Sequence, residues 1–233
     1  MKRSSCFDEY LLPLRHSNRL LFLINYILVR NSIRNLNTMN RKDWINNYID
    51  AGARLMQSLP VEKIDALIGI SEEAHISEKQ IFIFGNGGNA ASASHLACDL
   101  GKGASDKMDK RFRVLTLNDN PAWLTAIGND YAYEDVFVRQ LENFAQAGDV
   151  VISGSVSGNS PNLVKAFEWA KEQGLTTVSI TSSRRGRMSD LATLPIVLPD
   201  EHYGRVEDMQ MMIYHLIAFW FIEKETVQTK PIQ

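Results

Sequence analysis

The chain has 233 residues, 45% of them apolar and 22% charged, so it is long enough and apolar enough to bury a globular core. Its formal net charge of −2 gives no general attraction to nucleic acid or to an anionic membrane, and we expect neither as a partner. Two cysteines, Cys6 and Cys98, are too few for a disulfide framework and favour a reducing, cytoplasmic compartment.

Residues 1–38 differ from the rest of the chain, because they hold six basic side chains against two acidic ones. Their apolar run from Leu20 to Val29 is too short for a bilayer that needs ~20 residues, and no good signal-cleavage site follows it. Met39 stands directly before an amphipathic helical pattern. We therefore expect residues 1–38 to be an extension outside the fold and residues 39–233 to form one domain. A basic helix at a membrane surface is the alternative for the extension.

Two helical stretches are predicted between residues 43 and 77, with a break at Ser58-Leu59-Pro60. Beyond them, short apolar runs alternate with polar turns and helical patterns. Such runs are typical of strands that are buried on both faces of a parallel sheet. The predicted strands are 81–84, 114–117, 150–152, 177–180 and 194–198, and the helices between and after them are 90–101, 121–145, 161–173, 186–192 and 205–224.

This alternation predicts an α/β fold, a doubly wound five-stranded parallel sheet flanked by helices, with an N-terminal helical hairpin. Ligands of such sheets bind at the carboxyl ends of the strands, where the strand order reverses. The turns that directly follow the predicted strands are therefore the places to look for a site.

The turn after the first strand is Gly85-Asn86-Gly87-Gly88-Asn89. Its glycines let backbone N–H groups approach an anion, and the following helix adds the positive end of its dipole. The spacing fits neither a dinucleotide-binding fingerprint nor a Walker loop. A tight turn without a ligand is the alternative.

The turn after the third strand runs from Ser153 to Pro161 and holds four serines and two glycines. Ser160 and Pro161 are explained as the cap and first residue of the next helix. One serine suffices for a cap, whereas repeated hydroxyls at a helix N-terminus suit a phosphate monoester. Neither turn contains lysine or arginine, so neutral donors would hold the phosphate.

Three segments resemble the phosphoheptose isomerases, a family of sugar-phosphate isomerases with the SIS fold. They are the 81–95 segment Ile-Phe-Ile-Phe-Gly-Asn-Gly-Gly-Asn-Ala-Ala-Ser-Ala-Ser-His, the serine turn 155–160, and the 204–215 segment Gly-Arg-Val-Glu-Asp-Met-Gln-Met-Met-Ile-Tyr-His. The likeness covers roughly residues 43–225 and implies that residues 39–233 are a SIS domain.

The resemblance implies a catalytic and metal-binding group of four residues. His95 matches a metal-site histidine, Asp99 a glutamate that is both base and ligand, and His215 the catalytic histidine. Glu207 matches a glutamine that can bind the metal. A divalent ion, Zn²⁺ or similar, is expected on His95, Asp99, Glu207 and His215. Glu207 and His215 are separated by roughly 12 Å of helical rise, so a shared ion needs an irregular helix start or ligands from two subunits.

The remaining implied site residues contact substrate, and they include Asn129 and Asp130 for the sugar hydroxyls. The resemblance also implies a homotetramer with active sites at subunit interfaces. Two departures are that Asn89 replaces a family serine and Gly204 an acidic residue. The expected substrate-binding set is Asn86, Gly87, Gly88, Asn89, Asn129, Asp130, Ser155, Ser157 and Ser160.

Two functions follow. The first is an aldose–ketose isomerase that converts sedoheptulose 7-phosphate to a D-glycero-D-manno-heptose 7-phosphate through an enediol, for heptose biosynthesis, with Asp99 and His215 as the proton-transfer pair. The alternative is a non-catalytic SIS phosphosugar-binding protein, of the replication-initiator-binding or regulatory type. Because a binding protein has no need for His95, Asp99 and His215 together, the sequence favours the enzyme.

Overall fold

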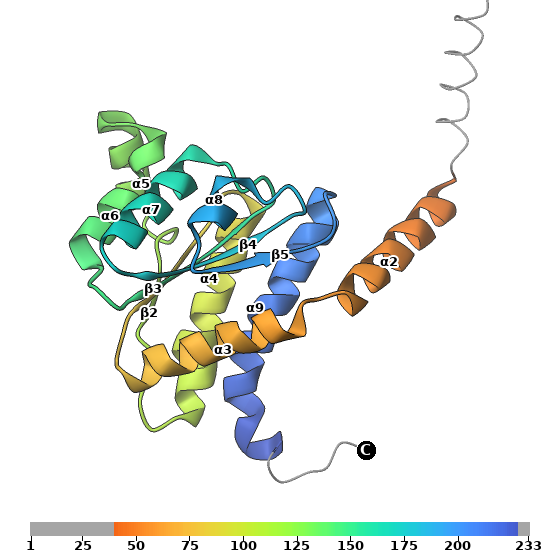
Figure 1. Cartoon of the computed structure of the whole chain (residues 1–233), viewed down its shortest axis with the longest axis horizontal. Helices are drawn as coiled ribbons and strands as arrows, with labels where there is room; N and C mark the ends of the chain where they lie inside the picture. The colour runs from red at the N-terminus through yellow and green to blue at the C-terminus, as the bar shows by residue number, and fades with distance from the viewer. Residues whose placement is uncertain (1–39, 228–233) are drawn as a thin grey trace, which may run out of the picture. The chain divides into compact units, whose positions relative to one another are not determined.

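The computed structural model describes residues 40–227, with side chains described as far as Lys224 (Figure 1). These residues fall into two compact units, of which one ends at Asp50 and the other begins at Ala51. The proposed extension, residues 1–38, lies outside the described residues, so its exclusion from the fold stays a prediction. Within residues 40–227, none of the helices is both long enough and apolar enough to cross a membrane.

The described part of the first unit is the beginning of helix α2 (Arg41–Gln57). Asn40 Oδ1 accepts hydrogen bonds from the backbone N–H groups of Lys42 (2.7 Å) and Asp43 (3.2 Å), which satisfies donors that have no partner inside a helix. Trp44 and Ile49 are exposed, and together with Ile45 they give the helix an apolar side.

The second unit contains a sheet of five parallel strands in the order β2-β1-β3-β4-β5. The chain therefore passes from β1 to β2 on one side of β1 and returns to place β3 on its other side. The carboxyl ends of β1 and β3 form the crevice where the strand order reverses, and a ligand is expected there. The strands are β1 (Ile81–Phe84), β2 (Val114–Thr116), β3 (Val150–Ser155), β4 (Thr176–Thr181) and β5 (Leu194–Val197).

Helices cover both faces of this sheet, as the continuous apolar strands predict (Figure 1). Ile81 and Ile83 pack into a core with α3, α4 and α9, whereas Phe82 and Phe84 pack into a second core with α6 and α7. The predicted fold class is confirmed. The helices of this unit are α3 (Val61–Ile76), α4 (Gly88–Cys98), α5 (Pro121–Asp130), α6 (Val138–Phe144), α7 (Pro161–Glu172), α8 (Gly186–Leu191) and α9 (Tyr203–Val227).

The single helix predicted over residues 121–145 is wrong. Helix α5 ends at Asp130, and a 3₁₀ turn (Tyr133–Asp135) separates it from α6. Tertiary contacts hold this connection, because the Tyr133 hydroxyl donates to Asn86 Oδ1 (3.2 Å) and Lys165 Nζ donates to Asp135 Oδ1 (2.6 Å). The helix predicted over 90–101 begins earlier, at Gly88, and continues after Cys98 as a π-helical turn (Asp99–Ala104).

Asp200 anchors the loop that leads into α9. Its carboxylate accepts from Arg205 Nε (2.6 Å) and Nη2 (2.9 Å) and from the backbone N–H groups of Glu201 and His202. Hydrogen bonds from the Arg205 guanidinium, together with those backbone donors, lower the pKa of Asp200 to about 2. This interaction fixes the start of the helix that carries Glu207 and His215.

We predict that Asp200→Asn lowers the free energy of unfolding at pH 7 by about 1–2 kcal/mol, because it keeps the shape but removes the charge. The folded-state pKa lies below the unfolded value, so this stabilisation is complete above about pH 4 and is lost as the pH falls towards 2. Chemical denaturation at pH 7 and pH 3 should show a smaller difference between wild type and variant at pH 3. An equal difference at both values would contradict the assignment.

Candidate active site

The glycine turn, residues 85–89, follows β1 and leads into α4. Asn118, which follows β2, clamps it: the Gly85 N–H donates to Asn118 Oδ1 (3.1 Å), and Asn118 Nδ2 donates to the Gly85 carbonyl oxygen (3.0 Å). Gly87 has φ +57°, a conformation that favours glycine. The turn is therefore held in one shape before any ligand binds.

Asn86 joins this turn to the serine turn. Its side-chain amide exchanges two hydrogen bonds of 2.9 Å with the amide of Asn162, a buried residue at the start of α7. Tyr133 adds a third bond to the same Asn86 side chain. Because its amide is already engaged, Asn86 fixes the distance between the two turns.

Hydrogen bonds within the serine turn, residues 155–160, also hold its backbone in one shape. Ser155 Oγ accepts from the Gly158 N–H (3.1 Å), and Ser157 Oγ accepts from the Asn159 N–H (3.3 Å). Each hydroxyl thus uses a lone pair within the turn, and its proton is left to donate to a ligand. Gly158 has φ +64°, and a Cβ there would lie 2.0 Å from the Arg185 carbonyl oxygen, so only glycine fits.

The two turns and the beginning of α9 enclose a cavity of about 290 Å³. Among the described residues that line it, Glu207 is the one carboxylate and none carries a positive charge. The two turns therefore offer neutral N–H and O–H donors, as the sequence predicts for a phosphate, and Glu207 adds one carboxylate to the lining. The lining residues are Asn86, Gly87, Gly88, Asn89, Gly154, Ser155, Val156, Ser157, Ser160, Leu163, Tyr203 and Glu207.

Gly154 lies near the end of β3 and lines the cavity. Because it has no side chain, helices α4 and α9 can pack closely against the strand at this point. A Cβ at this position would lie 2.3 Å from Asn89 Oδ1 and 3.1 Å from the Tyr214 hydroxyl oxygen. Burial raises the pKa of Tyr214, so its hydroxyl keeps its proton at neutral pH. A side chain at position 154 would therefore push α4 and α9 away from the sheet.

Ser160 occupies the N-cap position of α7 and Pro161 follows it, but the Ser160 side chain makes no capping hydrogen bond. The expectation that its hydroxyl caps the helix is therefore wrong. Asn162 Oδ1 instead accepts from the Leu163 N–H (3.0 Å) near the start of the helix. The Ser160 hydroxyl remains in the cavity, where a ligand can use it.

We predict that Ser157→Ala and Ser160→Ala, combined, weaken binding of a sugar phosphate by about tenfold or more, since each hydroxyl bond to a charged group contributes about 1.5–3 kcal/mol. Because the Ser160 side chain makes no cap, the free energy of unfolding should change little. Calorimetric titration and thermal melts test both points. Equal affinity in wild type and double variant would contradict the phosphate assignment.

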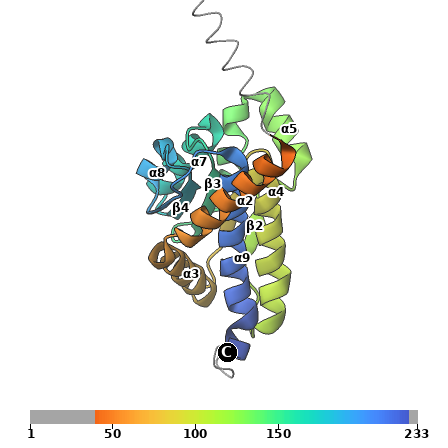
Figure 2. The same cartoon turned by 90° about the vertical axis from the view of Figure 1, so that its right-hand side faces the viewer.

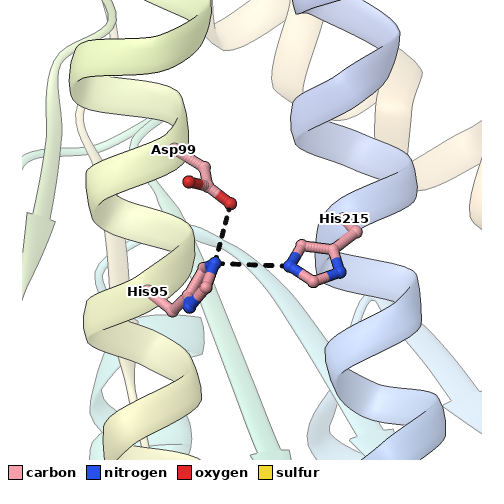
Figure 3. Close-up of side chains that lie close together, drawn as sticks. All are labelled: His95, Asp99 and His215. Atoms are coloured by element: carbon pink, nitrogen blue, oxygen red, sulfur yellow. Dashed lines mark hydrogen bonds and ion pairs between the residues drawn. The ribbon is translucent and has the colours of Figure 1, made fainter.

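His95, Asp99 and His215 come together between α4 and α9 (Figure 3). These helices run side by side, as Figure 2 shows. His95 Nε2 lies 3.2 Å from Asp99 Oδ2 and 3.3 Å from His215 Nε2. Asp99 is the first residue of the π-helical turn, a structure often found at functional sites. The pairing of His95 with Asp99 across one helical turn agrees with the sequence-based expectation.

The three side chains fit a divalent metal ion. Their ligand atoms lie within 4.8 Å of one another and comprise two imidazole nitrogens and a carboxylate oxygen. Neighbouring ligands of a tetrahedral ion with bonds of roughly 2.0–2.1 Å lie about 3.3 Å apart. Two of the three separations, 3.2 Å and 3.3 Å, therefore suit an ion of the zinc type.

Glu207 is not brought into this group. It lies in the regular part of α9, two turns before His215, and its carboxylate faces Gly88 and Asn89 at the cavity. Within one chain, the helical rise separates it from the His95 group, so a shared ion among all four residues is not found. Asn129 and Asp130 are exposed at the end of α5 and do not line the cavity; Asn129 Nδ2 donates to Asp130 Oδ1 (2.9 Å).

Sequence reasoning missed three residues that shape the site. Asn118 and Asn162 hold the glycine turn, and Tyr203 lines the cavity. Asn118 follows a predicted strand at its carboxyl end, which is a signal that could have identified it. Asn162 and Tyr203 lie in helices, where no local pattern distinguishes them from surface residues.

Comparison with known proteins agrees with this geometry. A family model described as "SIS domain" matches residues 47–182. A phosphoheptose isomerase of Sulfurimonas denitrificans is 39% identical over 166 residues, which cover 71% of this chain and 84% of the relative. The chain belongs to the phosphoheptose isomerase family of SIS-domain proteins. Another member, from Clostridium acetobutylicum, is 37% identical over 166 residues, 71% of this chain and 83% of its own.

Solved structures of phosphoheptose isomerases share the fold. One from Francisella tularensis has a TM-score of 0.74 and 19% identity, covering 79% of this chain and all of its own. Another, from Neisseria gonorrhoeae, has a TM-score of 0.72 and 23% identity, covering 78% of this chain and 98% of its own. The resemblance to phosphoheptose isomerases expected from three motifs is confirmed.

Proposed function

We propose that this protein is an aldose–ketose isomerase that converts sedoheptulose 7-phosphate to D-glycero-D-manno-heptose 7-phosphate. The observation that carries the proposal is the group formed by His95, Asp99 and His215, on two helices that begin at the phosphate-type cavity. Relatives named phosphoheptose isomerase support the choice of substrate. The pathway that fits this reaction is heptose biosynthesis.

In this mechanism Asp99 takes a proton from C1 of the ketose while His215 gives a proton to the carbonyl oxygen on C2. The electrons of the broken C–H bond form the C1=C2 double bond of an enediol. His215 then regains a proton from the hydroxyl on C1, and Asp99 returns its proton to C2, which leaves the aldose carbonyl at C1. The serine turn holds the phosphate throughout, with Ser155, Ser157 and Ser160 as donors.

His95, Asp99 and His215 would hold a divalent ion, most simply Zn²⁺, whose positive charge would stabilise the enediol oxygens when bound. Asp99 has two carboxylate oxygens, so it can face an ion with one and the substrate with the other. An imidazole nitrogen cannot hold an ion and carry a proton at the same time. With an ion on Nε2, His215 carries the proton on its other ring nitrogen, Nδ1.

Incubation of the purified protein with sedoheptulose 7-phosphate in D₂O tests the proposal. We expect the heptose product to carry deuterium at C2, because the proton held by the base exchanges with solvent. An unreacted ketose that nevertheless binds to the protein would overturn the enzyme assignment and favour the non-catalytic phosphosugar-binding alternative.

We also propose that the protein is a homotetramer with active sites at subunit interfaces. A groove of about 860 Å³ runs beside α3 and α9, and exposed apolar side chains line it, among them Met56, Leu216, Phe219 and Trp220. His215 lines the same groove. A second copy seated on this apolar surface would bury it and close the solvent-facing side of the His215 group.

We predict that Phe219→Glu combined with Trp220→Glu dissociates the tetramer and lowers isomerase activity. Charges placed in the groove would have to be desolvated in the assembly. Light scattering after size-exclusion chromatography measures the mass. Ile76→Glu, on an exposed apolar residue outside the groove, is the matched control and should leave the mass unchanged. A tetramer that survives the double change would place the interface elsewhere.

A cytoplasmic location is part of the same proposal. Sugar phosphates are intracellular metabolites, and Cys98 is a free, exposed thiol, which suits a reducing compartment.

A further inference from the structure

Tyr214 brings a buried hydroxyl to the end of β3. The residue directly precedes His215 on α9 and is 1% exposed, and its hydroxyl has no hydrogen-bond partner among the described residues. The nearby Gly154 N–H can only donate to the hydroxyl oxygen, so the hydroxyl proton still lacks an acceptor. A buried polar group without a partner costs free energy, and native proteins rarely leave one unused.

Asn89 supplies the matching acceptor. It is 5% exposed, and its Oδ1 is likewise buried without a hydrogen-bond partner in the described part of the chain. A Cβ on Gly154 would lie 2.3 Å from Asn89 Oδ1 and 3.1 Å from the Tyr214 hydroxyl oxygen, so both oxygens lie within 3.1 Å of one point. An unused donor and an unused acceptor therefore meet beside this glycine.

Gln210 is the competing acceptor, because it lies one helical turn before Tyr214 on α9 and its buried Oε1 also lacks a partner among residues 40–224. Its Nε2, however, donates to the Ile180 carbonyl oxygen (2.7 Å) on β4. Gln210 is thereby held over β4, whereas Asn89 and Tyr214 both reach Gly154 on β3. The geometry favours Asn89 as the acceptor.

The other side of the Asn89 amide faces the cavity. Asn89 lines the cavity, and its Nδ2 donates to Glu207 Oε1 at 3.5 Å. An asparagine amide that is turned by 180° exchanges its donors and its acceptor. A hydrogen bond from Tyr214 to Oδ1 selects the orientation in which the NH₂ group faces the cavity. The reversed orientation would place Oδ1 against the Glu207 carboxylate, which is acceptor against acceptor.

We propose that Tyr214 is a positioning residue, whose hydroxyl donates to Asn89 Oδ1, directly or through one water, and so keeps the Asn89 NH₂ group directed at the substrate. This inference rests on the proposed function. The NH₂ group has two hydrogens, so it can donate one to Glu207 and the other to an oxygen of the sugar phosphate. Tyr214 does not line the cavity, and it acts on substrate binding through Asn89.

The test is a double-variant cycle of Tyr214→Phe and Asn89→Ser, made in an Asp99→Asn background so that the ketose is not consumed. Calorimetric titration with sedoheptulose 7-phosphate measures the dissociation constant. Tyr214→Phe keeps the ring and should raise this constant about five- to tenfold. In Asn89→Ser, whose side chain is one bond shorter, the same change should alter it by less than about twofold. Tyr131→Phe, which removes an exposed hydroxyl outside the cavity, is the matched control and should not alter it.

The melting temperature gives a second readout, because a bonded and an unbonded buried hydroxyl affect stability in opposite directions. If Tyr214 bonds to Asn89, Tyr214→Phe should lower the melting temperature by about 2–4 °C. An unchanged or raised melting temperature would show that the hydroxyl has no acceptor and would overturn the inference. A decrease of the same size in Asn89→Ser would assign the bond to Gln210 and would also overturn it.

A purely structural role is excluded by the affinity, since it would lower the melting temperature and leave the dissociation constant unchanged. With Asp99 intact, Tyr214→Phe should raise KM and leave kcat within about twofold, because it weakens binding without removing a proton-transfer group. Binding that follows the cycle in a protein that does not isomerise the ketose overturns the proposed function alone. Isomerisation with an affinity that Tyr214→Phe does not change overturns this inference alone, and absence of binding overturns both.

Discussion

Replacing Asp99 with asparagine is expected to lower kcat by about 10²- to 10⁴-fold while KM changes little. Asparagine keeps the size and polarity of the side chain but cannot take a proton. A loss of this size corresponds to about 3–5 kcal/mol of activation free energy. Because the base acts in the transition state more than in the bound substrate, the effect should fall on kcat. Steady-state kinetics with sedoheptulose 7-phosphate measures both constants.

Asp99→Glu is the informative companion, because the resemblance to phosphoheptose isomerases implies a glutamate at this position. It should retain or raise activity if the shorter carboxylate is a compromise. Asp106→Asn removes an exposed carboxylate that pairs with Lys102 and Arg111, and it should leave kcat unchanged. Wild-type turnover in Asp99→Asn would place the base elsewhere, and Glu207 is then the next candidate.

The sheet could be predicted because strands that are buried on both faces are apolar at every position, and such runs are visible in the sequence. Ile81-Phe82-Ile83-Phe84 is apolar at every position, and all four side chains are buried, two in each core. The helical region after β2 could not be predicted to the same degree. Residues 131–137 break the helix because Tyr133 and Asp135 bond to partners that are distant in sequence, and a local pattern cannot show such contacts.

Part of the site could likewise be predicted from the local sequence, and part of it depends on how the helices pack. The glycine and serine turns could be located because each directly follows a strand, and strand ends meet at one edge of a parallel sheet. Spacing also placed His95 and Asp99 on one face of a helix. Nothing in the local sequence says which neighbouring helix a side chain on α9 faces. The arrangement of α4 and α9 therefore decided that His215 meets His95 and that Glu207 meets Gly88.

Removing a bound divalent ion is expected to abolish most of the isomerase activity. Metal content and melting temperature give two further measurements that do not depend on activity. We expect purified protein to contain up to one ion per chain by elemental analysis. Zn²⁺ at about 100 times its dissociation constant would stabilise the chelator-treated protein by about 2.7 kcal/mol. For a chain of this size that raises the melting temperature by about 5–10 °C. Adding Zn²⁺ should also restore kcat.

His95→Ala should lose both the ion and the thermal shift, because His95 Nε2 is the atom that lies between Asp99 Oδ2 and His215 Nε2. His202→Ala removes an imidazole in the loop before α9, outside this group, and should keep both. Protein without metal that gains no stability from Zn²⁺ and isomerises at full rate in a strong chelator would contradict the metal site. His215 would then be free to carry the hydroxyl proton, with His95 next to it as its hydrogen-bond partner.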